Sequence, residues 1–169
     1  IPWELAVDRP HAMAIRGQGA EQWTGASGDV LLSATFPQFT NLWDGKAYWT
    51  RADRGTERDK VSADSPAMGG ELVRLYGTGF GVVPGAETGK PARELPLANE
   101  LACHEKASRV RLPVSYAGLA PGEIGVYRVD VTLPAVEKAG AVELECELVG
   151  VTRGYTKASA TVPVMARPQ

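Results

Sequence analysis

Apolar side chains recur at every second position over most of this chain, and this alternation limits its possible folds more than any other feature. Residues 141–149 show the pattern most clearly, with four apolar residues between three glutamates: Val142, Leu144, Cys146 and Leu148 alternate with Glu143, Glu145 and Glu147. Successive side chains of a β-strand point to opposite faces of the sheet, so the apolar set is expected to face a core and the glutamates water. No long window shows the helical period of about 3.6 residues. The sequence therefore predicts an all-β protein.

Clusters of Gly, Pro, Asp and Ser separate the alternating segments. The predicted strands cover residues 11–17, 29–36, 46–51, 70–76, 98–105, 108–116, 124–133, 141–149 and 157–165. Short strands at this spacing are typical of a β-sandwich. Asp44-Gly45 predicts a hairpin with a type I′ turn, which needs positive φ at both central positions. Residues 53–69 are polar and predict a long connection.

The two ends of the chain resemble each other. Residues 1–36 run from a hydrophobic-Pro segment through an alternating strand closed by Gly to a second alternating strand, and residues 133–166 repeat this order. We interpret residues 1–64 as a partial first repeat with its connecting segment, and residues 65–169 as a complete sandwich. The strands within residues 1–36 either extend this chain's own sandwich or complete a sheet in a neighbouring subunit by strand addition, as in filaments.

Composition excludes several classes of function. The 169 residues, 44% hydrophobic and 22% charged, suit a globular protein with one core or one core and part of a second. The net charge of −2 and the scattered Lys and Arg residues offer no basic surface, so we expect no nucleic-acid partner. No apolar run is long enough for a spanning helix, so we expect no membrane insertion. Because the chain starts at Ile1 within a strand-like pattern, we expect it to be a processed or excised piece of a longer precursor.

Residues that could carry catalysis or hold a metal are few and scattered. His11 and His104 have no second ligand at a useful spacing. The glycines of the segment at residues 77–81 lack the spacing and the following helix of a dinucleotide loop, and they predict a bulge or corner in a strand. The segment at residues 25–29 does not complete the Gly-x-Ser-x-Gly elbow of a hydrolase. We therefore expect no enzyme activity and no cofactor.

Calcium is the metal that we considered most closely, because acidic loops between extracellular β-modules often bind it. Asp53, Glu57, Asp59 and Asp64 lie in one polar connection, but they do not form the D-x-D-x-D-G series of a calcium loop. We favour a solvated loop over a calcium site.

Aromatic residues flank the Asp44-Gly45 turn and are the candidate ligand-binding residues. They are Trp43, Tyr48 and Trp49. On the surface of a sheet such rings could stack on a sugar or mark a protein interface, and in a core they would only pack. The sequence leaves both interpretations open.

Residues 66–165 resemble a known domain family. Residues 65–81 (SPAMGGELVRLYGTGFG) are similar to the opening of the second module in an uncharacterised C-terminal domain family first catalogued in Solibacter proteins. Residues 116–122 (YAGLAPG), 125–131 (GVYRVDV) and 133–134 (LP) are the more specific match to this family. Residues 1–5 (IPWEL) and 36–40 (FPQFT) resemble its first-module strand end and its inter-module link.

This resemblance implies a fold and a location. It implies an immunoglobulin-like sandwich akin to IPT/TIG modules, found at the ends of secreted or cell-surface bacterial proteins, with no established catalytic role and no defined functional residues. Residues 1–64 would then be a partial immunoglobulin-like repeat, and residues 65–169 a complete one.

Cys103 and Cys146 are the two cysteines of the chain. Leu101 shares a face with Cys103, and Leu144 with Cys146, so both thiols are expected to point inward. Immunoglobulin-like topology would place their strands side by side, and we predict a disulfide that stabilises the fold by about 4 kcal/mol. The alternative is two buried free thiols that pack as small apolar groups.

These features predict a non-enzymatic structural or adhesive module of a secreted or cell-surface bacterial protein, which could assemble by strand addition between subunits. We expect a protein partner or self-association. The alternative function is a carbohydrate- or protein-binding module that uses Trp43, Tyr48 and Trp49, with a glycan as one ligand class.

Overall fold

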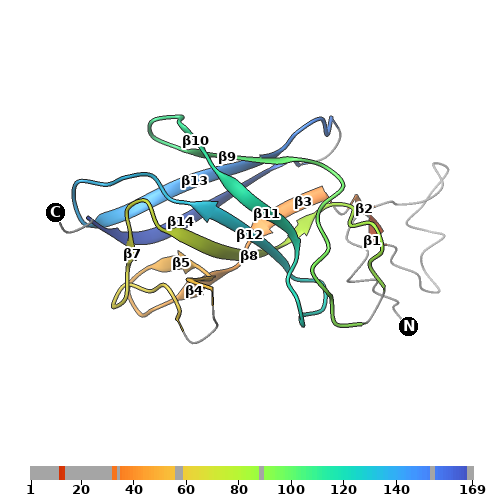
Figure 1. Ribbon diagram of the computed structural model, residues 1–169, viewed down its shortest axis with the longest axis horizontal. Coiled ribbons are helices and arrows are strands. Elements are labelled where there is room, and N and C mark those ends of the chain that lie inside the picture. The colour runs from red at the N-terminus through yellow and green to blue at the C-terminus, as the bar shows by residue number, and fades with distance from the viewer. Residues whose placement is uncertain are drawn as a thin grey trace.

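The structure is a computed structural model, and the part of the chain that it describes contains strands and loops without a helix. The described residues are 12–13, 32–33, 35–55, 59–87, 90–152 and 155–166. Two large sheets form the body of the molecule (Figure 1). The all-β prediction is confirmed.

One large sheet has five strands, and all neighbours are antiparallel except the last pair, which is parallel. Its order is β10 (Arg111–Leu112), β9 (Leu101–Glu105), β13 (Gly140–Leu148), β14 (Lys157–Met165) and β7 (Ala67–Met68). The predicted strands at 141–149 and 157–165 correspond to β13 and β14.

The second large sheet is antiparallel and also contains five strands. Its order is β11 (Val114–Leu119), β12 (Tyr127–Thr132), β8 (Leu72–Phe80) and β3 (Thr35–Phe39), with β6 (Ala52–Asp53) also paired to β8. β12 pairs along one edge of β8, while β6 and β3 follow one another along the other.

Two short antiparallel strand pairs complete the described strands. β1 (Ala12–Met13) pairs with β2 (Leu32–Ser33), and β4 (Asn41–Trp43) pairs with β5 (Tyr48–Thr50). The β4–β5 hairpin lies between β3 and β6 in the sequence. Figure 1 shows it beside the two large sheets, on the side of β8.

The two large sheets share one hydrophobic core. β8 and β12 contribute Val73, Leu75, Val129 and Val131, and the facing sheet contributes Leu101, Leu144 and Val162, all nearly inaccessible to water. On β13, the apolar set predicted to face inward is buried, and the glutamates between them are exposed or half-buried. The predicted orientation of this strand is therefore confirmed.

The predicted strand at 108–116 is two strands in different sheets. β10 pairs with β9, whereas β11 pairs with β12, and Pro113 lies between them. Proline has no N–H to give to a ladder, so pairing stops there and the chain crosses from one sheet to the other. The alternating pattern continues across this crossing, and for that reason it predicted one strand.

The pairing of β3 bears on whether the N-terminal strands extend this chain's own sandwich or a neighbouring subunit's sheet. It pairs with β8 of the same chain, which is the first of the two predicted arrangements. The described strands β3 and β6 thus lie in one sheet with β8, while the division of the chain between residues 64 and 65 stays a prediction. Of the predicted first repeat, residues 1–11, 14–31, 34 and 56–58 lie outside the described residues.

β3 approaches the glycines of β8 closely. A Cβ atom at Gly77 would lie 2.4 Å from the Gln38 carbonyl oxygen, so only glycine allows this contact. Thr35 pairs with Phe80 and Gln38 with Thr78, which leaves one extra residue on β3. The bulge predicted for the glycine segment is therefore on the strand opposite it.

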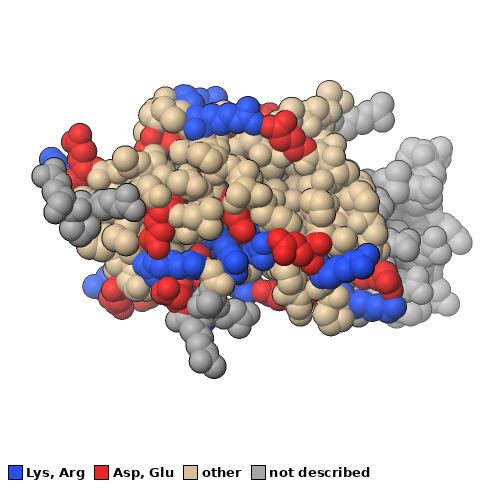
Figure 2. Space-filling view, viewed as in Figure 1, with Lys and Arg blue, Asp and Glu red and all other residues tan. Residues whose placement is uncertain are grey.

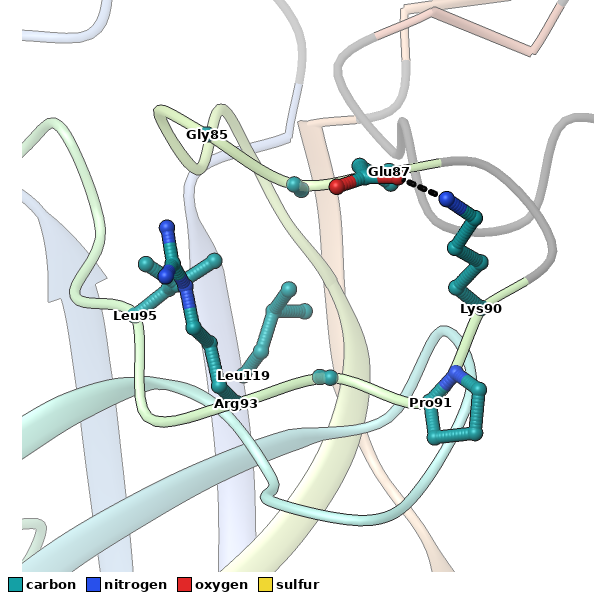
Figure 3. Close-up of a pocket in the computed structure, with 9 residues that line it drawn as sticks. Gly85, Glu87, Lys90, Pro91, Arg93, Leu95 and Leu119 are labelled. Carbon is teal, nitrogen blue, oxygen red and sulfur yellow. Dashed lines mark hydrogen bonds and ion pairs between the residues drawn. The ribbon is translucent and has the colours of Figure 1, made fainter.

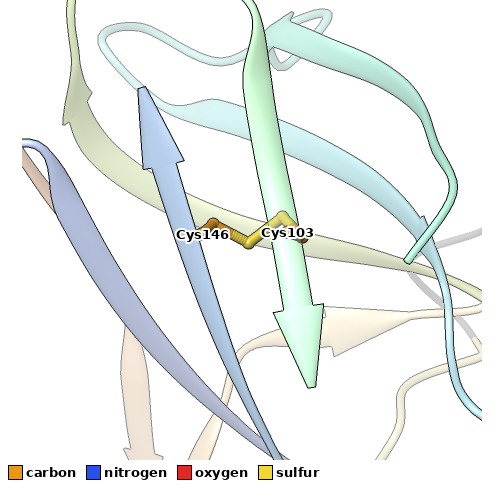
Figure 4. The surroundings of a disulfide bond; sticks show 2 residues. All are labelled: Cys103 and Cys146. Carbon is orange, nitrogen blue, oxygen red and sulfur yellow. A yellow bond between two sulfur atoms is a disulfide. The ribbon is translucent and has the colours of Figure 1, made fainter. Parts of the chain in front are cut away.

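Cys103 and Cys146 form a disulfide, as predicted (Figure 4). They face each other in the register of β9 and β13, with their Cα atoms 4.0 Å apart, and both side chains are fully buried. The bond joins two neighbouring strands of one sheet and closes a loop with a sequence separation of 43. It does not cross between the two layers.

Candidate binding surface

The β4–β5 hairpin is fixed to the sandwich through Thr50. The Thr50 side chain is 1% exposed, and its Oγ1 accepts a hydrogen bond from the backbone N–H of Thr161 on β14 at 2.9 Å. The same hydroxyl donates to Asn41 Oδ1 at 3.1 Å. Because β7 pairs only with the last residues of β14, the β14 edge near Thr161 is available for this contact. The base of the hairpin is therefore held by the core sheet.

The connection between β4 and β5 differs from the predicted type I′ turn. Trp43 pairs with Tyr48, so the loop has four residues, and Gly45 has positive φ whereas Asp44 does not. Asp44 Oδ1 accepts hydrogen bonds from the backbone N–H groups of Lys46 and Ala47, both at 2.8 Å. These bonds, that of Ala47 first, lower the pKa of the Asp44 carboxyl. The carboxylate thus organises a longer loop than the dipeptide pattern predicts.

Trp43 and Tyr48 lie together on one face of the hairpin. They are directly opposite each other, with ring centroids 4.9 Å apart and ring planes at 49°. Their exposed fractions are 57% and 64%, so these two rings are on the surface and not in the core.

Trp49 is separated from this pair. It is the cross-strand partner of Leu42, and alternation places both on the opposite face of the hairpin. Its Nε1 donates to Asp44 Oδ2 at 2.6 Å, which holds the half-buried indole against the loop. Of the three aromatic residues predicted to form one platform, the structure brings two together.

The face that carries Leu42 looks onto a hollow of about 360 Å³, which we call the hairpin hollow. It is lined by Leu42, Arg51, Ala52, Asp53, Lys60, Val61 and Tyr76. These residues come from four separate segments, which meet because Asp53 forms a β-bridge with Lys60 and β6 pairs with β8. No local pattern in the sequence could have indicated this grouping.

A hydrogen-bonded pair forms the floor of the hairpin hollow. The Tyr76 hydroxyl donates to Asp53 Oδ2 at 2.6 Å, and Asp53 Oδ1 accepts the N–H of Gly55 at 2.9 Å. Burial, and then the bond to Asp53, raises the pKa of Tyr76. The Arg51 guanidinium lies 4.3 Å above the Tyr76 ring and forms two hydrogen bonds with Glu123, at 2.6 and 2.9 Å. The floor is therefore rigid and its carboxylate is already bonded.

The outer face of the β11–β12–β8 sheet carries a second charged group. Arg128 lies 4.4 Å from the centroid of the Tyr116 ring, and its Nε is 2.9 Å from Asp130 Oδ1. Arg74 donates to the carbonyl oxygen of Gly55 at 2.6 Å. Burial raises the pKa of the Asp130 carboxyl, and the nearby arginines oppose this effect. Figure 2 shows that basic and acidic side chains are interspersed on the face in view.

A third feature is a hollow of about 210 Å³ among the loops that follow β8 (Figure 3). Glu87 and Lys90 form an ion pair at its rim, and Arg93, Leu95 and Leu119 are among the other residues that line it. This pairing lowers the pKa of Glu87 and raises that of Lys90. Its described lining contains no Ser, Cys or His that could act as a nucleophile or base.

The residues considered for metals do not converge in the described part of the chain. His104 is on β9, and Asp53 is bonded to Tyr76, whereas Asp59 pairs with Arg54. His11 and Glu57 lie outside the described residues. Over the described ranges, no three His, Cys, Asp or Glu side chains come together as metal ligands would.

Comparison with known proteins gives no matching family model, no matching curated protein and no matching solved structure. The resemblance to the Solibacter-type family therefore stays a prediction. In the part of the chain that the structure describes, no helix is long and apolar enough to cross a membrane.

Proposed function

We propose that this chain is a non-enzymatic adhesive module of a secreted or cell-surface protein, and that its β4–β5 hairpin contacts the partner. The observation that carries the proposal is the exposure of Trp43 and Tyr48 on a hairpin whose base and loop are both fixed. Large exposed apolar side chains gathered at one place mark interaction sites more often than isolated ones do. Because the hairpin is held before binding, little conformational entropy is lost when it docks.

The strand order supports an immunoglobulin-like module. In that fold, strands A, B, E and D form one sheet and strands C, F and G the other. Here the first sheet has the order β3, β8, β12, β11, and the second contains β9, β13 and β14 in succession. The disulfide is compatible with an oxidising, extracellular location.

A protein is the partner that we favour. Trp and Tyr are enriched among the residues that dominate protein interfaces. The rings of Trp43 and Tyr48 are tilted by 49°, so together they form a wedge and not a single flat platform. A glycan is the second candidate, since each ring is more than half exposed and could stack on one sugar.

Assembly by strand addition is a separate proposal for residues 1–36. Its described end, β3, pairs within the chain, and most of the remainder lies outside the described residues. Light scattering after size-exclusion chromatography tests it: a monomer at every concentration contradicts assembly between copies of this chain.

The test of the hairpin compares a Trp43→Ala/Tyr48→Ala variant with Tyr155→Ala, which removes an exposed aromatic ring elsewhere. The purified chain is used to capture proteins from the extracellular fraction, each captured protein is purified and remeasured, and a glycan array is run in parallel. We expect the double variant to weaken binding at least about tenfold, because two interface aromatics are lost, and Tyr155→Ala to bind normally. Equal binding by all three chains would overturn the proposal.

A further inference from the structure

We propose that the hairpin hollow is a second contact site, which takes an extended partner segment carrying an aliphatic side chain next to a carboxylate. This inference rests on the proposed adhesive function and names the chemistry of the partner. It uses the face of the hairpin that carries Leu42, which we call the inner face, whereas Trp43 and Tyr48 lie on the opposite face, which we call the outer face.

The walls of the hollow suit an aliphatic side chain. Leu42 lines it and is still 51% exposed, so this face of the hairpin has no covering layer within the described structure. Ala52 and Val61 lie deeper and are buried. The volume of about 360 Å³ is at the lower end of the range for small-molecule sites, which suits one side chain and its neighbouring backbone.

The charges of the hollow favour an anion. Arg51 and Lys60 line it with one carboxylate, that of Asp53, and because Arg51 is also ion-paired with Glu123, Lys60 supplies the charge that favours an anion. Both oxygens of Asp53 already accept hydrogen bonds, from Tyr76 and Gly55, so this group has little to offer a cationic ligand. Within the described structure Lys60 forms no ion pair, and its backbone is fixed by the bridge to Asp53. The Lys60 ammonium is therefore the group to which a carboxylate would bind.

The rigid floor of the hairpin hollow also favours ligand binding. Arg51 is held above Tyr76 and by Glu123, and Tyr76 by Asp53, so the hollow does not need to be ordered when a ligand enters. A preformed site with one unpaired cation at its rim binds an anion without first breaking an internal ion pair.

The experiment is a titration of the ¹⁵N-labelled chain, followed by amide chemical shifts, with N-acetyl-L-leucine as the anionic probe and N-acetyl-L-leucinamide as the neutral one. We expect the anionic probe to shift the amides of residues 42, 52, 60, 61 and 76. The neutral probe should bind the same place about fivefold more weakly, since it lacks the exposed ion pair.

Four variants sharpen the test. Lys60→Gln should remove the difference between the two probes, whereas Lys46→Gln, an equal charge change on the hairpin loop, should keep it. Leu42→Ala should weaken both probes. Trp43→Ala/Tyr48→Ala should leave both unchanged, so that failure of this site can be told from failure of the outer face.

The inference would be overturned if the wild-type chain bound the two probes with equal affinity, or if Lys46→Gln removed the difference between the probes as fully as Lys60→Gln does. It would also be overturned if the shifted amides lay elsewhere in the molecule, or if millimolar probe shifted none. The proposed function would still stand if the outer-face variant weakened adhesion. The amide spectra of the variants report directly that each remains folded.

Discussion

The β9–β13 region and the β4–β5 hairpin are both built from alternating side chains, yet the apolar side chains are buried in the first and exposed in the second. On β13 one face is buried against the second sheet, and the other carries glutamates. On the hairpin the outer face carries Trp43 and Tyr48, more than half exposed, and the inner face carries Leu42 above a hollow. Alternation commits a segment to a strand, but a face becomes core only when another sheet covers it. Stability should therefore depend on the first region and binding on the second.

The largest effect on stability is expected from the disulfide. Replacing both cysteines, Cys103→Ala/Cys146→Ala, should lower the free energy of unfolding by about 4 kcal/mol, because the bond restricts a long loop in the unfolded chain. Chemical denaturation measures the change. A loss below about 1 kcal/mol would contradict the contrast between the two regions. Binding through the hairpin should persist below the denaturation midpoint.

The next effect is expected where the hairpin joins the core. Thr50→Val removes the acceptor for the Thr161 N–H and leaves that backbone group unpaired beside a buried side chain. The free energy of unfolding should fall by about 1–3 kcal/mol. Thr78→Val on β8 is the matched control, since Thr78 is exposed and in a strand. Equal effects of the two changes would mean that the contact does not anchor the hairpin.

Alkaline pH should weaken the fold through two tyrosines. Burial raises the pKa of Tyr127, whose hydroxyl donates to the Gly81 carbonyl oxygen at 2.6 Å, and burial and Asp53 raise that of Tyr76. Their contribution is complete below pH ~10, where unfolded tyrosine is also protonated, and is lost as the pH rises further.

The measurement is the free energy of unfolding against pH. Each tyrosine should lower it by up to about 1.4 kcal/mol per pH unit above ~10. Tyr127→Phe should be less stable at neutral pH but should lose less stability on going to high pH. An unchanged slope in this variant would rule out Tyr127 as a source.

The smallest effect on stability is expected from the outer face of the hairpin. Trp43→Ala should change the free energy of unfolding by only about 0.2–1 kcal/mol, the range of a cross-strand pair. Leu144→Ala, in the core, should cost about 2–5 kcal/mol. If Trp43→Ala were as costly as Leu144→Ala, the aromatic pair would be structural, and its role in binding would have to be abandoned.

The sequence predicted best where one physical cause dominates. The strands β13 and β14 follow from alternation, which also decides which way Cys103 and Cys146 point. Their pairing was predicted from the immunoglobulin-like topology that the resemblance implies, which places the two strands side by side. β6 and β7 were missed since two-residue strands have no pattern to read. β7 also lies within the connection predicted for residues 53–69.

The remaining differences come from tertiary context. At Pro113 the chain passes from one sheet to the other, which the alternating pattern does not indicate. The hydrogen bonds of the Asp44 carboxylate favour a four-residue loop, which the Asp44-Gly45 dipeptide alone does not predict. The exposure of Trp43 and Tyr48 depends on the absence of a covering sheet from the described structure. Lys60 could join the candidate site only after distant segments had been placed together.

The position of the disulfide has a mechanical consequence. Because it links neighbours within one layer, a stretching force applied to the two ends of the chain can separate the layers while the segment between Cys103 and Cys146 stays closed. With a sequence separation of 43, the oxidised chain should extend about 150 Å less than the reduced chain when pulled. If such a chain tethers two surfaces, the tether under load would thus be shorter than its reduced form, and would keep part of its structure, for as long as the disulfide stays intact.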